Sequence, residues 1–119
     1  MLKAEPLSDR ALRVTPSGKL SAADFNSLSA VVDEMIERNG SIRVLIDAYA
    51  FSGWDSLAAL EAHAGFIKSH QARVERLAVI VGRNWQHWLV DTVRLVLHPE
   101  ARAFDRAHEK DALDWIRAA

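Results

Sequence analysis

The sequence predicts an α/β fold in a single domain spanning residues 1–119, with a mixed, mainly parallel sheet of four to five strands and about four helices. Two runs, residues 42–46 and 77–81, are almost wholly apolar and rich in Ile and Val, as expected of strands buried on both faces. Segments with apolar residues at helical spacing separate the candidate strands. This alternation favours parallel strands joined by right-handed crossovers.

The composition narrows the class of protein. The chain has 119 residues, half of them apolar, which suffices for one hydrophobic core. It has no cysteine, which excludes disulfides, thiolate metal sites and a cysteine nucleophile. A net charge of -1 gives no reason to expect nucleic acid binding. No apolar run approaches the roughly 20 residues of a membrane span, and the first ten residues lack a signal-peptide core. We therefore expect a cytoplasmic protein, with peripheral membrane contact as a candidate.

The first twenty residues predict two strands. Residues 1–5 form a short edge strand that stops at Pro6, and residues 8–10 form a tight turn. Residues 11–15 alternate in part between apolar and polar side chains, so they form the next strand. Pro16-Ser17-Gly18 bends or ends that strand, and Lys19-Leu20 extends it.

A helix begins after Ser21. Ser21 and Asp24 have the spacing of a capping box, with Asp in place of the usual Glu. Asn39-Gly40 ends the helix, because either residue adopts the left-handed conformation of a C-terminal cap. The predicted apolar face consists of Phe25, Leu28, Val32 and either Met35 or Ile36.

The second half of the chain predicts alternating strands and helices. Asp47 ends the strand at 42–46, and a loop closing on Gly53 leads to a helix that begins near Asp55. The strand at 77–81 ends at Gly82. The predicted apolar face of the helix between them is Leu57, Leu60, Ala64 and Ile67.

The last part of the chain predicts two further helices around a short strand. Asn84 caps a helix over residues 85–97, which Pro99 stops. Residues 101–104 form the last strand. Asp105 caps a final helix that carries Leu113, Trp115 and Ile116.

The start of the first predicted helix carries a motif of a known family. It reads Gly18-Lys19-Leu20-Ser21-Ala22-Ala23-Asp24-Phe25 and resembles the G-K-L-T-x-x-D-Y motif of SpoIIAA-like proteins in the STAS superfamily. The resemblance continues in order through residues 42–46, 51–54 and 77–82, Trp85 and Trp88, Phe104, and residues 112–116. It implies a STAS-like fold and a non-enzymatic protein. The wider group includes anti-anti-sigma factors, and the SpoIIAA-like branch is similar to lipid-carrying Sec14-type domains.

The residues at the start of the second predicted helix indicate whether the chain carries a phosphorylation switch. Anti-anti-sigma factors carry an Asp-Ser-Ser/Thr-Gly-Leu signature there, in which a hydroxyl is phosphorylated. Asp55 and Ser56 match it, whereas Leu57 and Ala58 replace the second hydroxyl and the glycine. A simple helix cap is the favoured explanation of Asp55 or Ser56. Ser52, Asp55 and Ser56 remain a candidate surface for a protein partner.

The predicted helix at 85–97 has more apolar surface than one sheet-facing stripe requires. The excess predicts a hydrophobic groove between the second and third helices, for a lipid or another hydrophobic ligand. The alternative explanation of this excess apolar surface is that both faces of the helix are buried, in the core or against a second copy of the chain. The predicted groove residues are Trp54, Leu60, Phe66, Ile67, Trp85, Trp88 and Leu89.

The histidines predict neither a metal site nor a catalytic base. His63 and His70 are seven positions apart, so about 10 Å separates them along a helix, which is too far to share a metal. His87 and Asp91 form an i, i+4 pair without a third ligand, and His98 lies at a helix C-terminus. Solvated helix faces are the favoured positions of these side chains.

The function predicted from the sequence is a small STAS-like binding module with no enzymatic activity, cofactor, metal or nucleic acid partner. It binds a hydrophobic ligand or lipid, or docks at a membrane or a protein partner, and homodimerisation is a candidate. The alternative is an anti-anti-sigma-type signalling protein that acts through protein–protein interaction. An enzyme is the least supported class, because no nucleophile, base and orienting group can be assembled.

Overall fold

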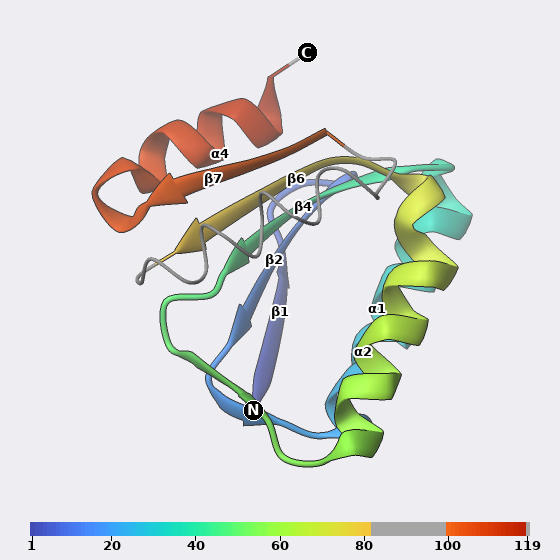
Figure 1. Cartoon of the computed structure of the whole chain (residues 1–119). Helices are drawn as coiled ribbons and strands as arrows, with labels where there is room; N and C mark the ends of the chain where they lie inside the picture. The colour runs from blue at the N-terminus through green and yellow to red at the C-terminus, as the bar shows by residue number, and fades with distance from the viewer. Residues whose placement is uncertain (82–99, 119) are drawn as a thin grey trace.

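A five-stranded sheet in the order β1-β2-β4-β6-β7 is the centre of the computed structural model, which describes residues 1–81 and 100–118 (Figure 1). β1 pairs antiparallel with β2, and the pairs from β2 to β7 are parallel. The prediction of a mixed, mainly parallel sheet is confirmed. The strands are β1 (Leu2–Pro6), β2 (Ala11–Pro16), β4 (Ile42–Asp47), β6 (Val74–Val81) and β7 (Glu100–Asp105).

Helices cover both faces of the sheet. α1 (Ala22–Asn39) and α2 (Leu57–His70) lie side by side on one face, and α4 (Glu109–Arg117) lies on the other (Figure 1). Alternate residues of β4 supply the two cores, since Val44 packs with the α1 residues and Leu45 packs with the α4 residues. Full burial of one such side chain contributes about 1.5–3 kcal/mol. No helix in the described part of the chain is long and apolar enough to cross a membrane.

α1 has the boundaries that its sequence predicts. The Asp24 backbone N–H donates to the Ser21 hydroxyl at 3.2 Å, and the Ser21 N–H donates to the Asp24 carboxylate at 2.9 Å. Gly40 ends the helix with a φ of 83°, which favours glycine, and its N–H donates to the Ile36 carbonyl. The buried residues of α1 are Phe25, Leu28, Val32 and Met35.

A second, two-stranded parallel sheet was not predicted. It pairs β3 (Gly18–Leu20) with β5 (Phe51–Trp54), where the sequence predicts an extension of the previous strand and a loop. Gly18 and Gly53 have φ values of 63° and 118°. Strands of three and four residues containing such glycines resemble turns in sequence, because they are too short to show alternation.

The predicted apolar face of α2 is wrong in part. Leu57 and Leu60 are exposed, at 70% and 41%, and Ala64 is also exposed. The helix instead buries Ala59 and His70, and its His63 ring stacks on Phe25 of α1.

The C-terminal helix begins later than predicted. A 3₁₀ turn, η2 (Arg106–His108), separates Asp105 from α4, and a similar turn, η1 (Gln71–Arg73), follows α2. α4 buries Ala112 and Ile116. The helix predicted over residues 85–97, with its cap at Asn84, lies outside the described residues.

Candidate functional site

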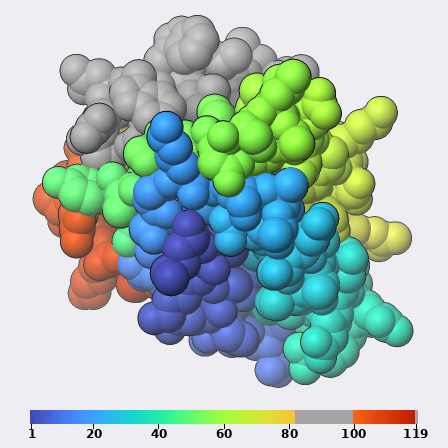
Figure 2. Space-filling view, turned by 90° about the horizontal axis from the view of Figure 1, so that it is seen from below, coloured from blue at the N-terminus to red at the C-terminus, as the bar shows by residue number. Residues whose placement is uncertain are grey.

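Five residues form an exposed surface where β5 leads into α2. This α2 N-terminal surface consists of Ser52, Asp55, Ser56, Leu57 and Leu60, all of them exposed. Figure 2 shows the green start of α2 on the outside of the molecule. The structure therefore brings the predicted partner residues together and adds two leucines to them.

The start of α2 is fixed by hydrogen bonds from its own sequence. The Asp55 N–H donates to the Leu20 carbonyl of β3 at 2.9 Å, which ends the small sheet. Ser56 is extended, with φ −159°, and its hydroxyl accepts from the Ala59 N–H at 3.1 Å. Ser56 is thus the N-terminal cap of α2, as the favoured explanation of this segment predicts.

A ring cluster supports this segment from beneath. Trp54 Nε1–H donates to His63 Nδ1 at 3.1 Å, so the neutral His63 ring carries its proton on Nε2. The His63 ring stacks on Phe25 of α1 at 4.7 Å between centroids, and Phe51 meets the Trp54 ring edge-on at 5.4 Å. Burial lowers the pKa of His63 below its ordinary value. The default prediction of a solvated histidine is wrong here, because His63 faces α1 and β5.

His70 makes a second link between α1 and α2. Its Nε2 lies 2.7 Å from Asp33 Oδ1, and its Nδ1 lies 2.7 Å from the Phe66 carbonyl oxygen. Its ring also stacks on the Phe66 ring at 4.4 Å between centroids. His70 is buried, so the prediction of a solvated ring is wrong for this histidine as well.

The groove residues predicted on α2 lie on more than one of its faces. Phe66 is half-buried and packs against the α1 core, 6.5 Å from the ring of Phe25. Leu60 is exposed on another face, so α2 does not bring it together with Phe66. Ile67 is half-buried and lies seven positions after Leu60, on the same side of the helix. Trp54 is half-buried, and Trp85, Trp88 and Leu89 lie outside the described residues.

An ionic cluster lies at the carboxyl ends of β2 and β4, on the α4 side. Arg13 donates to Asp47 at 3.0 Å and to Glu109 of α4 at 2.6 Å. The hydrogen bond that Arg13 donates to Glu109, followed by the charges of both carboxylates, raises the pKa of Arg13 against the opposing effect of burial. Beside it, the Arg106 guanidinium lies 4.3 Å from the Tyr49 ring centroid. The Arg13–Glu109 ion pair joins α4 to β2, and Arg106 of η2 contacts the loop that follows β4.

Sequence reasoning did not find the Trp54–His63 pair or the Arg106–Tyr49 contact. The members of each pair lie in different elements, and no periodicity links them. In residues 1–81 and 100–118 no group of three or more His, Asp or Glu side chains is arranged to hold a metal ion.

The comparisons with known proteins agree with this architecture. A family model described as SpoIIAA-like matches residues 11–117. The chain belongs to the SpoIIAA-like family. A solved structure of an uncharacterised protein from Shewanella loihica PV-4, of the DUF3478 family with a SpoIIAA-like fold, is 25% identical. That match covers 98% of this chain and 92% of the other, with a TM-score of 0.80.

SpoIIAA itself shares the fold of this SpoIIAA-like protein. The anti-sigma factor antagonist SpoIIAA in its unphosphorylated form is 14% identical, with full coverage of both chains, 100% and 100%, and a TM-score of 0.68. The Bacillus cell fate determinant SpoIIAA in its phosphorylated form is 13% identical, over 95% of this chain and 99% of the other, with a TM-score of 0.64. The comparison with curated proteins finds no significant match.

Proposed function

We propose that this SpoIIAA-like protein is a non-enzymatic docking module that binds a partner protein at its α2 N-terminal surface. The observation that carries the proposal is the exposure of Leu57 and Leu60, 70% and 41%. These residues are three positions apart and therefore neighbours on the helix surface. Adjacent exposed apolar side chains with a polar rim are typical of protein interfaces.

The surroundings of the two leucines favour a protein partner. Ser52, Asp55 and Ser56 supply hydrogen-bonding groups at the rim. The Trp54–His63 hydrogen bond and the cap at Ser56 hold the segment in place before any partner arrives. A preformed surface loses less conformational entropy on binding, so more of the contact energy is available as affinity.

The likeness to SpoIIAA supports the same class of function. SpoIIAA is an anti-sigma factor antagonist, and it has a phosphorylated and an unphosphorylated form. At 13–14% identity the likeness establishes the fold, and its extension to partner binding is part of our proposal. We do not extend phosphorylation to this chain, because Leu57 and Ala58 replace the second hydroxyl and the glycine of the anti-anti-sigma signature.

Binding of a hydrophobic ligand or lipid, with peripheral docking at a membrane, is the second candidate. The half-buried Ile67 extends the apolar strip of Leu57 and Leu60 along α2, and a continuous apolar strip favours this second candidate. Native mass spectrometry of the purified protein tests it. A retained lipid or fatty acid would favour this candidate over a protein partner, and a second copy of the chain would appear as a dimer.

Site-specific photo-crosslinking in the native host tests the docking proposal. A benzoylphenylalanine replaces Leu57 in one variant and Val31, an exposed apolar residue of α1, in the matched control. The proposal expects one defined protein adduct from position 57 and none from position 31. Equal adducts from both positions, or none from position 57, would contradict it.

A further inference from the structure

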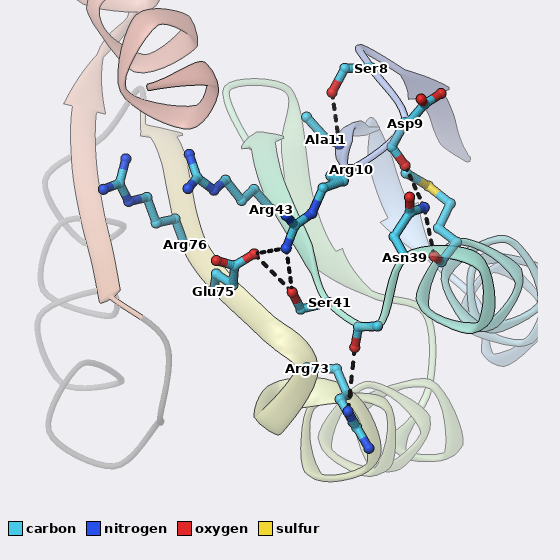
Figure 3. A network of polar contacts seen from close by, with 12 residues as sticks. Ser8, Asp9, Arg10, Ala11, Asn39, Ser41, Arg43, Arg73, Glu75 and Arg76 are labelled. Atoms are coloured by element: carbon cyan, nitrogen blue, oxygen red, sulfur yellow. Dashed lines mark hydrogen bonds and ion pairs between the residues drawn. The ribbon is translucent and has the colours of Figure 1, made fainter. Parts of the chain in front are cut away.

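Four arginines gather around the amino ends of β4 and β6 and the C-terminal end of α4. This arginine cluster consists of Arg10, Arg43, Arg76 and Arg102. Arg43 of β4 and Arg76 of β6 are register partners, so adjacent strands place them about 4.8 Å apart. Figure 3 shows both side chains extending toward α4, with Arg10 beside them. Positive charge is thus concentrated in a protein whose net charge is -1.

The partners of Arg43 and Arg76 on α4 are neutral groups. Arg43 donates to the carbonyl oxygens of Ile116, at 3.1 Å, and Ala118. Arg76 donates to the Trp115 carbonyl at 2.9 Å, and its guanidinium also lies 5.3 Å from the Trp115 ring centroid. These bonds complement the negative end of the helix dipole and hold the guanidinium groups in place. Arg43 makes no ion pair with a carboxylate of the described residues, and Arg76 has one long contact, with Glu100 at 3.9 Å.

One carboxylate shows how this cluster binds an anion. Glu75 has no register partner, since β4 pairs Ile42 with Val74 and Arg43 with Arg76, so it forms a bulge. Its Oε1 accepts from Arg10 at 2.6 Å and from the Ser41 hydroxyl at 2.8 Å (Figure 3). The Ser41 hydrogen bond, followed by the charges of Arg10, Arg43 and Arg76, lowers the pKa of Glu75.

Among the described residues, the four arginines form ion pairs with two carboxylates, those of Glu75 and Glu100. The other acidic group, Glu100, is 70% exposed and lies 3.9 Å from Arg76, so it is weakly held. Arg102 is exposed and stacks on the Trp115 ring at 4.9 Å, and no carboxylate in the described part of the chain pairs with it. Arg10 is 54% exposed. A further carboxylate would therefore meet accessible guanidinium groups that are already in position.

We propose that the arginine cluster docks a glutamate- or aspartate-rich segment of a partner protein. Charge complementarity identifies the occupant, and the binding of Glu75 shows that this chemistry fits the cluster. The cluster lies at the amino ends of the strands, whereas the α2 N-terminal surface lies beyond the carboxyl end of β4. The two proposals therefore stand or fall separately.

Binding of a fluorescein-labelled glutamate-rich peptide to the full chain, followed by anisotropy at about 20 mM salt, tests the proposal. Arg102→Glu reverses an exposed charge that contacts α4 through the Trp115 ring, and it should weaken binding at least about tenfold. Lys110→Glu is the matched control, because it makes the same charge change in the exposed first turn of α4. It should change the affinity less than about twofold. About 200 mM salt should weaken wild-type binding, because the charges are exposed.

Several outcomes would overturn the proposal. They are no binding of the peptide by wild type, an equal loss in both variants, or tighter binding of a single-stranded DNA of matched charge, which would indicate a nucleic acid site. Arg102→Gln is the second variant if Arg102→Glu lowers the melting temperature, because it removes the charge without introducing repulsion. Retention of wild-type affinity by Arg102→Gln would also contradict the proposal.

Discussion

Replacement of His63 by Phe should destabilise the protein through one lost hydrogen bond. Trp54 Nε1–H donates to His63 Nδ1 at 3.1 Å, and Phe keeps a ring that stacks on Phe25 but offers no acceptor. An N–H left without a partner in a buried position costs about 1–3 kcal/mol. Trp54 is half-buried, so we expect the lower half of that range. For a domain of this size the loss corresponds to roughly 3–8 °C in Tm.

Urea and thermal unfolding followed by circular dichroism measure this effect. Trp54→Phe and the double variant complete a thermodynamic cycle. The double variant should be less destabilised than the sum of the two single variants, because neither partner remains to be left unsatisfied. A His63→Phe protein as stable as wild type, or strictly additive variants, would refute the reasoning.

Three further predictions follow from the described contacts. Burial lowers the pKa of His63 in the folded state. The contribution of neutral His63 to stability is therefore complete above the unfolded pKa of about 6.5 and should decline as the pH falls below that value. His63→Phe should flatten that part of the stability–pH profile. Ser56→Ala should lower the free energy of unfolding by about 1 kcal/mol through loss of the cap, whereas Ser56→Asp should change stability little. Stoichiometric phosphate on Ser56 in protein from the native host would contradict the view that Ser56 is a helix cap and not a phosphorylation site. Val79→Asp should cost several kcal/mol because Val79 is buried, and a Tm within a few degrees of wild type would show that this burial is unimportant.

The sequence predicts the elements whose signals are local and strong. The capping box at Ser21 and the glycine at position 40 define α1, because both act through nearby backbone groups. The apolar runs of β4 and β6 identify central strands, because strands covered on both faces typically read as near-continuous apolar runs.

The sequence predicts the functional surface less well, because its pattern misleads at α2. Leu57 and Leu60 have the spacing of a core stripe but lie at the surface, while His63 and His70 pack against α1. Rings that find a hydrogen bond and a stacking partner can be buried, and for these two histidines Phe25 and Asp33 of α1 are partners that the α2 periodicity does not reveal. The arginine cluster is hidden for the same reason, since the register of four strands assembles it.

One measurement tests the central claim most directly. It compares the Kd of wild type and of Leu57→Ser for the partner protein that crosslinking identifies. Burial of one leucine at an interface contributes about 1.5–3 kcal/mol, so the variant should raise Kd about ten- to hundredfold without loss of folding. Val31→Ser, the matched change on α1, should leave Kd within about twofold. Equal Kd values for wild type and Leu57→Ser would contradict docking at the α2 N-terminal surface.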